Sequence, residues 1–504
     1  MSTRGDRTML SALIWLPIVA ATVLLCWPGT LSAAWAQRSA AIAAGAALAI
    51  AIALFFQFDP QIHDWQLLEQ LPWIEQLGLG YRLGVDGLSL PLVGLNALLT
   101  FLIIAGLERQ EQRSRLYYGL MLLLSGAVSG AFLAQDLLLF FVFYEVELIP
   151  LYLLISIWGG ARRGYAATKF LIYTALSGAL LLIGFLALTI LSGAGSFAYN
   201  PNLAAVLPIA QQVTLLVLIL VAFGIKTPIV PFHTWLPDAH VEASTPVSMM
   251  LAGVLLKLGT YGILRFGLGL FPQVWPIVAP WLAGLAVVST LYGSLSAIVQ
   301  QDMKKMVAYS SIGHMGYILL AAAAATPLSL LGAVCQMISH GLISALLFLE
   351  VGFVYSRTGT RDLRVLQGLL TPERGLPIVG SLMILAVMAS GGLPGMVGFI
   401  AEFMIFRGSF STFTVQTLFC MVGTGLTSVY FLLLVNRAFF GRLPDQMETL
   451  PNVALREHIP ALMLATLIVI FGVQPQWLVV WTEPATAALG NLAVIASRAL
   501  DALT

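Results

Sequence analysis

Apolar stretches of roughly 20 residues, the length that an α-helix needs to cross the hydrocarbon core of a bilayer, recur along the whole chain. Short polar connections separate them, and none is long enough to hold a folded soluble domain. A membrane β-barrel would show shorter segments of alternating polarity instead. The pattern therefore predicts an all-α polytopic membrane protein.

The same pattern predicts about 14 membrane-spanning helices. They cover residues 9–27, 34–56, 86–107, 116–134, 136–158, 168–192, 211–234, 245–268, 274–299, 305–324, 328–355, 377–406, 412–438 and 458–481. The remaining tail, residues 484–502, is expected to form a surface or partly buried helix. Arg4, Arg7 and the apolar residues after them also resemble a secretory signal peptide, but an ordinary first membrane helix is the preferred interpretation.

The stretch from Phe223 to Gly259 carries Lys226 and Lys257 in two consecutive apolar segments. A lysine in hydrocarbon costs several kcal/mol unless it is paired or faces a watery cavity. Prolines in the first half of this stretch remove backbone donors and prevent a continuous helix; they are Pro228, Pro231 and Pro237. Broken helices are tolerated at membrane depth only where they are buried in protein or line a cavity. We therefore expect a path for charge here.

Two segments with the same spacing of residues suggest an internal repeat. Residues 224–232 and 391–399 share glycine, valine and phenylalanine at equal spacing, with a proline near the middle of each. Paired helix interruptions of this kind point to the binding region of a transporter built from inverted repeats. The two segments lie in the seventh and twelfth predicted helices, an offset of five helices, and an odd offset gives the repeats opposite orientations.

Composition supports the membrane assignment and narrows the choice of functions. Of the 504 residues 59% are hydrophobic and 9% are charged, and the mean hydropathy is +0.93, which excludes a soluble globule. A net charge of +1 argues against a nucleic-acid partner. Cys26, Cys335 and Cys420 lie in apolar stretches without CxxC spacing, and His233 and His240 match no common zinc spacing. We expect no metal or redox centre in this chain.

Lysine and arginine are distributed unevenly between the two sides of the predicted helices. If the N-terminus lies outside, the inward connections hold 16 basic residues and the outward segments hold 6, while Lys226 and Lys257 complete the total of 24. Connections rich in lysine and arginine stay on the negative side of the membrane. The bias predicts that the N-terminus lies on the positive side and that the loop 233–242 lies on the negative side.

Few titratable residues fall inside the predicted helices, which makes them informative. Glu145 and Glu147 are two residues apart, so they lie on nearly opposite faces of a helix and one cavity cannot easily use both. Structural pairing explains any single buried charge, but the whole set exceeds what packing requires. Lysine and glutamate become titratable near neutral pH when they are buried, and histidine already is. The set suits proton transfer; its other members are Lys226, Lys257, His314, His340, Glu350 and Glu402.

Longer motifs resemble the antiporter-like subunits of respiratory complex I. They occupy residues 83–89 (LGVDGLS), 232–240 (FHTWLPDAH), 242–248 (EASTPVS), 309–316 (YSSIGHMG) and 340–348 (HGLISALLF). This family shares an ancestor with multisubunit sodium/proton antiporters. It has 14 helices, with two inverted repeats of five and broken helices seven and twelve. The resemblance implies a three-helix segment at 1–110, repeats at 111–268 and 269–438, and a C-terminal helix and tail at 439–504.

The resemblance also implies the functional residues. The family's essential glutamate precedes a proline by five positions, which selects Glu145 over Glu147. The central lysines of helices seven and eight match Lys226 and Lys257, and we expect Glu145 and Lys226 to form an ion pair near the midplane. The histidines of helices ten and eleven and the terminal residue of helix twelve match His314, His340 and Glu402.

Helix twelve carries two distinguishing features. Its Glu402, where sibling subunits have lysine, resembles the M subunit, which is called D in photosynthetic-type complexes and subunit 4 in mitochondria. Met396, Val397 and Ala401 stand where relatives usually have Thr, Ser or Asn and then Gly. These apolar residues put in question how much water reaches the last part of the proton path, beside helix twelve.

Residues 73–89 are similar to the photosynthetic D form. That form occurs in thylakoid complexes that pass electrons from ferredoxin or NAD(P)H to plastoquinone, and some of its paralogues belong to complexes specialised for CO2 uptake. The resemblance implies a proton-translocating subunit in a thylakoid or bacterial inner membrane, among lipids and L/F-like and N/B-like antiporter-like subunits. It implies no cofactor bound by this chain, because quinone and iron–sulfur clusters belong to other subunits.

Two other interpretations stay open. The chain could belong to a stand-alone multisubunit cation/proton antiporter of the Mrp type. It could also be a structural membrane scaffold whose charges only pair, in which case neutralising Lys226 would leave transport unchanged.

Overall fold

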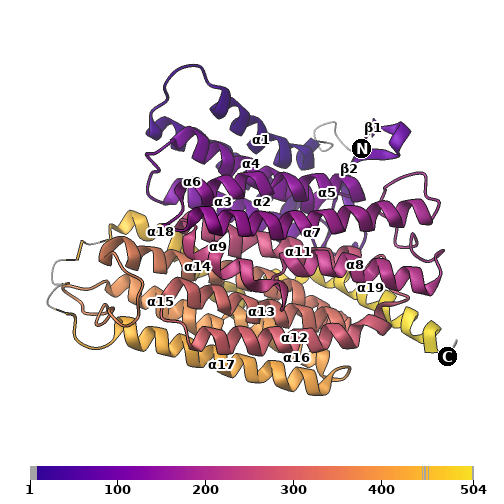
Figure 1. Cartoon of the computed structure of the whole chain (residues 1–504). Helices are drawn as coiled ribbons and strands as arrows, with labels where there is room; N and C mark the ends of the chain where they lie inside the picture. The colour runs from indigo at the N-terminus through magenta and orange to yellow at the C-terminus, as the bar shows by residue number, and fades with distance from the viewer. Residues whose placement is uncertain (1–7, 445–446, 448–449, 452, 502–504) are drawn as a thin grey trace.

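The computed structural model describes residues 8–444, 447, 450–451 and 453–501. Long helices run side by side in one bundle (Figure 1). In this described part, thirteen helices are long and apolar enough to cross a membrane, and α3 (Leu90–Gly106) and α15 (Pro377–Ser390) are shorter apolar helices. The structure therefore confirms the predicted all-α polytopic membrane fold.

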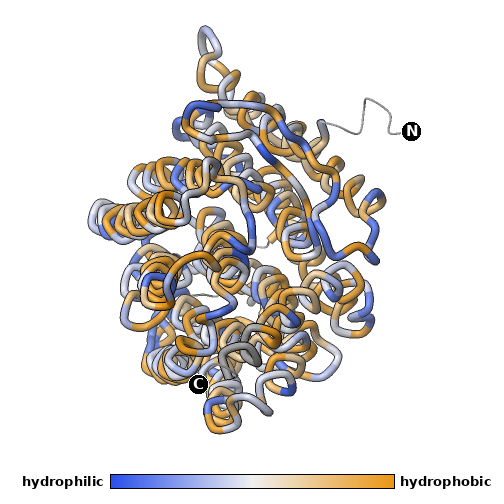
Figure 2. Tube along the Cα trace, turned by 90° about the vertical axis from the view of Figure 1, so that its right-hand side faces the viewer, coloured by the Kyte–Doolittle hydropathy of each residue, from blue (hydrophilic) through white to orange (hydrophobic). Residues whose placement is uncertain are grey.

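The remaining helices follow the predicted segments in chain order. They are α1 (Met9–Cys26), α2 (Ala33–Gln57), α4 (Ser114–Leu133), α5 (Leu137–Val146), α6 (Leu148–Trp158), α7 (Arg163–Leu191), α8 (Ile209–Lys226), α9 (Trp235–Glu242), α10 (Thr245–Met250), α11 (Leu256–Gly262), α12 (Trp275–Ile298), α13 (Met303–Ala324), α14 (Pro327–Thr358), α16 (Val397–Phe410), α17 (Thr414–Phe439), α18 (Leu455–Val473) and α19 (Gln476–Asp501). Apolar residues cover the helices, whereas hydrophilic residues concentrate in the connections (Figure 2).

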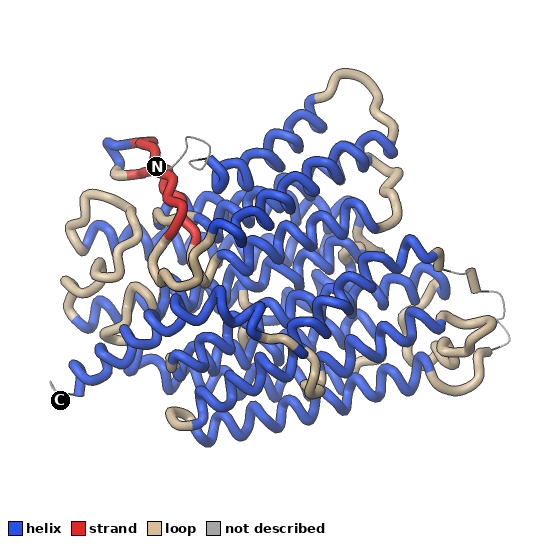
Figure 3. The backbone as a smooth tube through the Cα atoms, turned by 180° about the vertical axis from the view of Figure 1, so that it is seen from behind, coloured by secondary structure: helices blue, strands red, loops and turns tan. Residues whose placement is uncertain are grey.

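The start of α1 and the end of α19 lie on the same face of the bundle, at the right in Figure 1 and at the left in Figure 3. We call it the termini face. The opposite face carries the end of α17, the start of α18 and most of the arginine-rich connections, and we call it the basic face. A chain whose two ends lie on the same face of the bundle crosses that bundle an even number of times.

A small β-hairpin on the termini face was missed by the sequence analysis. Strands β1 (Gln66–Ile74) and β2 (Leu79–Val85) pair antiparallel. The first strand buries one of its nine positions, so it lacks the alternation of a half-buried strand. Asp86, directly after β2, forms a buried ion pair with Arg265 and accepts hydrogen bonds from the backbone of Leu88 and Ser89. The motif at residues 83–89 thereby ties the hairpin to the bundle.

The predicted helix breaks are confirmed. The chain leaves helical geometry after Lys226 and resumes at the short 3₁₀ turn η3 (Phe232–Thr234) and α9, as the prolines between them require. The second break separates α15 from α16 at residues 391–396. A further interruption lies between α5 and α6 at Glu147, where Pro150 cannot donate to the carbonyl of residue 146.

The last membrane segment differs from its predicted bounds. The structure ends α18 at Val473 and starts α19 at Gln476, so the segment predicted at 458–481 crosses a break and the helix predicted at 484–502 begins earlier. Pro475 supplies the physical reason, because it ends one helix and suits the start of the next. Apolar periodicity alone does not register such a break.

The segment that carries Lys257 is helical throughout but wound irregularly. Two π-helical turns, η4 (Leu251–Leu255) and η5 (Ile263–Leu268), flank α11. Every residue from Leu251 to Leu268 is buried. π turns release carbonyl groups from regular helix bonding and often lie at functional sites.

Candidate functional site

Lys226 lies at the last residue of α8, directly before the break, and is 2% exposed. Its Nζ forms an ion pair with Glu147, which is fully buried at the interruption between α5 and α6. The ring of Tyr144 lies 4.5 Å from the same Nζ and adds a cation–π contact. A lysine at membrane depth thus has a paired anion and an aromatic face, as its charge requires.

The expected pair between Glu145 and Lys226 is wrong. Glu145 is partly exposed and lies against α7, where its carboxylate occupies the space beside Gly178. It retains an electrostatic interaction with Lys226 without forming the ion pair. The two-residue spacing correctly separates the carboxylates to different faces, but the position of α8 decides which one reaches the lysine.

A chain of hydrogen bonds through two hydroxyl groups connects the helices around the ion pair of Lys226 and Glu147. The Tyr144 hydroxyl lies 2.8 Å from Ser177 Oγ, and Ser177 donates to the carbonyl of Ala222 at 2.7 Å. These contacts join α5, α7 and α8 beside the break. The pair therefore sits in a region where three helices are positioned together.

Lys257 is fully buried directly after the π turn η4. Its Nζ donates to the carbonyl of Ala252 at 2.5 Å and lies 2.7 Å from Nδ1 of His340 on α14. The carbonyl belongs to the π turn, so the irregular winding supplies one of the lysine's partners. Lys257 is bound by a carbonyl and a histidine, in contrast to the carboxylate at Lys226.

Lys226 and Lys257 belong to adjoining parts of neighbouring helices. Gly259, two residues after Lys257, packs against Thr227 and the carbonyl of Phe223 at the end of α8. A side chain at Gly259 would collide with these groups. The glycine therefore permits the broken end of α8 to approach α11.

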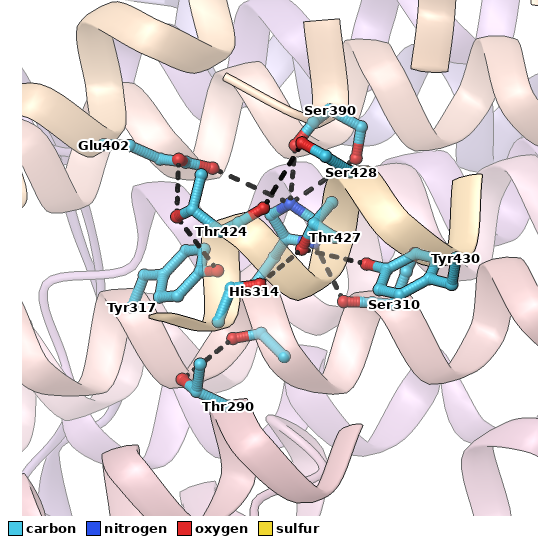
Figure 4. Close-up of polar contacts among 12 residues, drawn as sticks. Thr290, Ser310, His314, Tyr317, Ser390, Glu402, Thr424, Thr427, Ser428 and Tyr430 are labelled. Carbon is cyan, nitrogen blue, oxygen red and sulfur yellow. Dashed lines mark hydrogen bonds and ion pairs between the residues drawn. The ribbon is translucent and has the colours of Figure 1, made fainter. Parts of the chain in front are cut away.

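The chain of contacts continues from His340 through His314 to Glu402. The two imidazole rings are 5.6 Å apart between centroids, and Nε2 of His314 lies 3.8 Å from Oε1 of Glu402. Nδ1 of His314 donates to the carbonyl of Ser310 at 2.8 Å, which leaves Nε2 facing Ser390 and Glu402 (Figure 4). His340, His314 and Glu402 are all at most 5% exposed.

Hydroxyl groups around Glu402 were missed by the sequence analysis. Thr424 on α17 donates to Oε2 of Glu402 at 3.0 Å and also lies 3.3 Å from the hydroxyl of Tyr317 (Figure 4). The apolar Met396 and Val397 at the break are thus complemented by polar groups from α13 and α17. The sequence signal that indicates such hydroxyl groups is the spacing of Thr424, Thr427 and Ser428 on one predicted helix.

The geometry brings four of the six predicted residues into one chain of contacts: Lys257, His340, His314 and Glu402. Lys226 forms a second centre with Glu147, while Glu145 lies beside it. Buried acids, bases and imidazoles in such a row can pass a proton by short steps.

Comparisons with known proteins agree on one family. Residues 134–427 match the family model described as NADH:quinone oxidoreductase/Mrp antiporter, transmembrane. NAD(P)H-quinone oxidoreductase chain 4 2 of Thermosynechococcus vestitus is 42% identical over 488 residues, covering 93% of this chain and 89% of the relative. Chain 4 2 of Microcystis aeruginosa is 44% identical over 456 residues, covering 88% and 81%.

Solved structures show the same fold. A chain of respiratory complex I from Thermus thermophilus with bound NADH superposes with a TM-score of 0.86 at 28% identity, covering 96% of this chain and 99% of that one. A chain of the Mrp complex from Dietzia sp. DQ12-45-1b has a TM-score of 0.86 at 23% identity, covering 99% and 100%. The chain therefore belongs to the NADH:quinone oxidoreductase/Mrp antiporter family, as an integral membrane, antiporter-like subunit of the chain 4 type found in NAD(P)H-quinone oxidoreductases.

Proposed function

We propose that this chain moves protons across an energy-transducing membrane by a relay through Glu145, Lys226, Lys257, His314, His340 and Glu402, with Glu147 as the ion-pair partner of Lys226. The row of buried contacts from Lys257 to Glu402 carries this proposal. A purely structural scaffold would need paired charges, whereas Lys257 is bound by a carbonyl and an imidazole, and by no carboxylate among the described residues.

The relay has two parts with different roles. The ion pair between Lys226 and Glu147 is a charge switch, because separating the partners leaves an uncompensated charge in a buried environment. Lys257 and His340 are close enough for direct proton transfer between Nζ and Nδ1. His314 then passes the proton from His340 toward Glu402, with its Nε2 facing the carboxylate.

We infer that the subunit serves a complex that passes electrons from NAD(P)H to a quinone, as the names of its relatives suggest. Ferredoxin is the alternative electron donor that the sequence resemblance implies. Quinone and iron–sulfur clusters would lie on other subunits, and L/F-like and N/B-like antiporter-like subunits and lipids would surround this one. Our proposal covers both the respiratory or photosynthetic form of this complex and the form that is specialised for CO2 uptake. Membership of an Mrp-type antiporter is the second candidate, favoured by the fold shared with the Dietzia complex.

The orientation follows from charge. The basic face would lie on the negative side of the membrane, and the termini face on the positive side, because lysine and arginine gather in the connections of the basic face.

Substituting Lys257→Arg in the intact complex tests the proposed function. Arginine keeps the positive charge but effectively never releases its proton. We expect the number of protons moved per electron to fall in membrane vesicles, while electron transfer with an uncoupler continues. A normal ratio in the arginine variant would show that Lys257 is a counter-charge and would contradict the relay.

A further inference from the structure

Glu350 is a buried carboxylate outside the relay. It lies on α14, eight residues before the end of that helix, and its side chain is 0% exposed. Neither carboxylate oxygen has a hydrogen-bond partner among the described residues. A bare carboxylate at membrane depth is costly, and such residues generally serve transport or pair with a nearby group.

The face of α14 that carries Glu350 meets α18. Residues three, four and seven apart share a helix face, so Glu350, Phe353 and Arg357 lie in one row. The ring of Phe353 is 5.7 Å from that of His458, and Arg357 Nη2 is 2.6 Å from a carboxylate oxygen of Glu457. We call this row and its two partners on α18 the α14–α18 seam.

Titratable groups line the seam from the basic face inward. Arg357 and Glu457 form its outer end, and Arg357 also approaches Glu108 at 3.7 Å. His458 comes next, 2% exposed and with Nδ1 unpartnered within the described structure. Glu350 lies two helical turns, about 10 Å, deeper than Arg357 at a rise of ~1.5 Å per residue. The seam thus leads from the basic face to a buried acid.

The same face of α14 continues toward the relay. Ser339 and Gln336 lie on it, three to four turns deeper, and each is buried with a side-chain oxygen that no described residue satisfies. Gly332, one turn further, packs directly against Ile405 of α16, the helix that carries Glu402. Buried polar atoms without protein partners are normally solvated by internal water.

The break between α15 and α16 adjoins this path. Gly472 of α18 packs against the carbonyl of Gly395 and against Met396 within the break, and Ile343 of α14 packs against Gly398. Interrupted helices at membrane depth expose backbone polar groups only toward protein or a watery cavity. The break therefore supplies polar backbone beside Ile343, about one turn from Ser339 and within the roughly three turns that separate Ser339 from Glu350.

We propose that Glu350 is a second proton-accepting site, reached by water from the basic face along the α14–α18 seam, that supplies Glu402 without passing through Lys226. A hydronium ion would transfer one proton to a carboxylate oxygen of Glu350, and the same proton would then leave through water past Ser339 to Glu402, restoring the carboxylate. This inference rests on the proposed role of Glu402 in proton transfer.

Cysteine labelling tests whether water reaches Glu350. In a background with Cys26, Cys335 and Cys420 replaced by serine, Glu350→Cys is compared with Leu349→Cys, a buried position at the same depth on another face. A small membrane-impermeant methanethiosulfonate is added to the basic face of the intact complex. We expect the thiol introduced at position 350 to react at least about tenfold faster than the thiol introduced at position 349, because the reactive thiolate forms in contact with water. Equal, slow labelling overturns the proposal.

Substitution of the carboxylate tests whether the site carries protons. Glu350→Gln keeps the size but cannot titrate, and we expect it to lower the protons moved per electron while electron transfer with an uncoupler continues. Glu350→Asp should restore much of the ratio, which a purely structural role would not predict. A normal ratio in the glutamine variant overturns this inference alone, provided that Lys257→Arg still impairs pumping; normal pumping in both variants overturns the proposed function as well.

Discussion

At the scale of single residues, the main question is which glutamate of the α5–α6 segment, Glu145 or Glu147, is the functional partner of Lys226. Glu147 is buried and bound to Lys226, whereas Glu145 is partly exposed beside Gly178. Removing one partner of a buried pair costs about 3–5 kcal/mol because the other charge stays uncompensated. We therefore expect Glu147→Gln to lower the protons moved per electron more than Glu145→Gln.

Proton pumping and uncoupled electron transfer, measured on both variants in membrane vesicles, check this prediction. Each variant should still assemble, because glutamine retains the volume of glutamate. If Glu145→Gln abolishes pumping while Glu147→Gln pumps normally, the ion pair seen in the structure is not the one that carries the switch.

Thr424 provides a second residue-scale prediction. Its hydroxyl donates to Glu402 at 3.0 Å, and an intramolecular hydrogen bond contributes about 0.5–1.5 kcal/mol net. Thr424→Val preserves the shape and removes the donor, so we expect slower pumping. Thr424→Ser keeps the donor and serves as the matched control. Equal pumping rates in the two variants would contradict a role for this hydroxyl.

Which residues belong to the site could be predicted from the sequence more readily than the partner and role of each one. The lysines, histidines and Glu402 stood out because charges are rare in apolar segments. The choice of Glu147 over Glu145 depended on where α8 lies, which no local pattern encodes. Thr424 and Tyr317 were missed because hydroxyl residues are common in membrane helices and carry no charge to mark them.

At the scale of helices, Gly259 controls the approach of α8 to α11. A methyl group there would collide with Thr227 and with the carbonyl of Phe223. Overpacking of this kind costs about 1–3 kcal/mol, and it would displace both Lys226 and Lys257. We expect Gly259→Ala to lower the thermal stability of the complex and its pumping ratio together.

Gly284→Ala is the control for that helix-scale prediction, because a side chain at Gly284 of α12 meets no atom within 4 Å. Thermal unfolding and proton-pumping measurements on both variants make the comparison. Unchanged stability and pumping in Gly259→Ala would show that the two helices can separate without cost.

Helix breaks divided into those that sequence could predict and those that it could not. Pro228 and Pro231 predict the helix break after Lys226. A cluster of glycines with one proline predicts the helix break before α16. The π turns around Lys257 were missed because they leave an apolar segment apolar. The hairpin was missed because β1 is mostly exposed and lacks alternation.

At the scale of the whole molecule, the orientation in the membrane is the testable quantity. Arg162 lies in the connection between α6 and α7 on the basic face, and Leu77 lies in the hairpin on the termini face. In cysteine variants of sealed vesicles, we expect an impermeant reagent on the negative side to label position 162 only, and the same reagent on the positive side to label position 77 only. Labelling of position 162 from the positive side would reverse the proposed orientation.

The shared face of the first and last helices has a practical consequence for anyone who tags this protein. Helix α1 starts and helix α19 ends on the termini face. Two fluorescent reporters fused to the opposite ends of the chain would share one aqueous compartment, so energy transfer between them could be followed without crossing the bilayer. A tag used for purification at either end would also leave the basic face free for neighbouring proteins and for reagents added there.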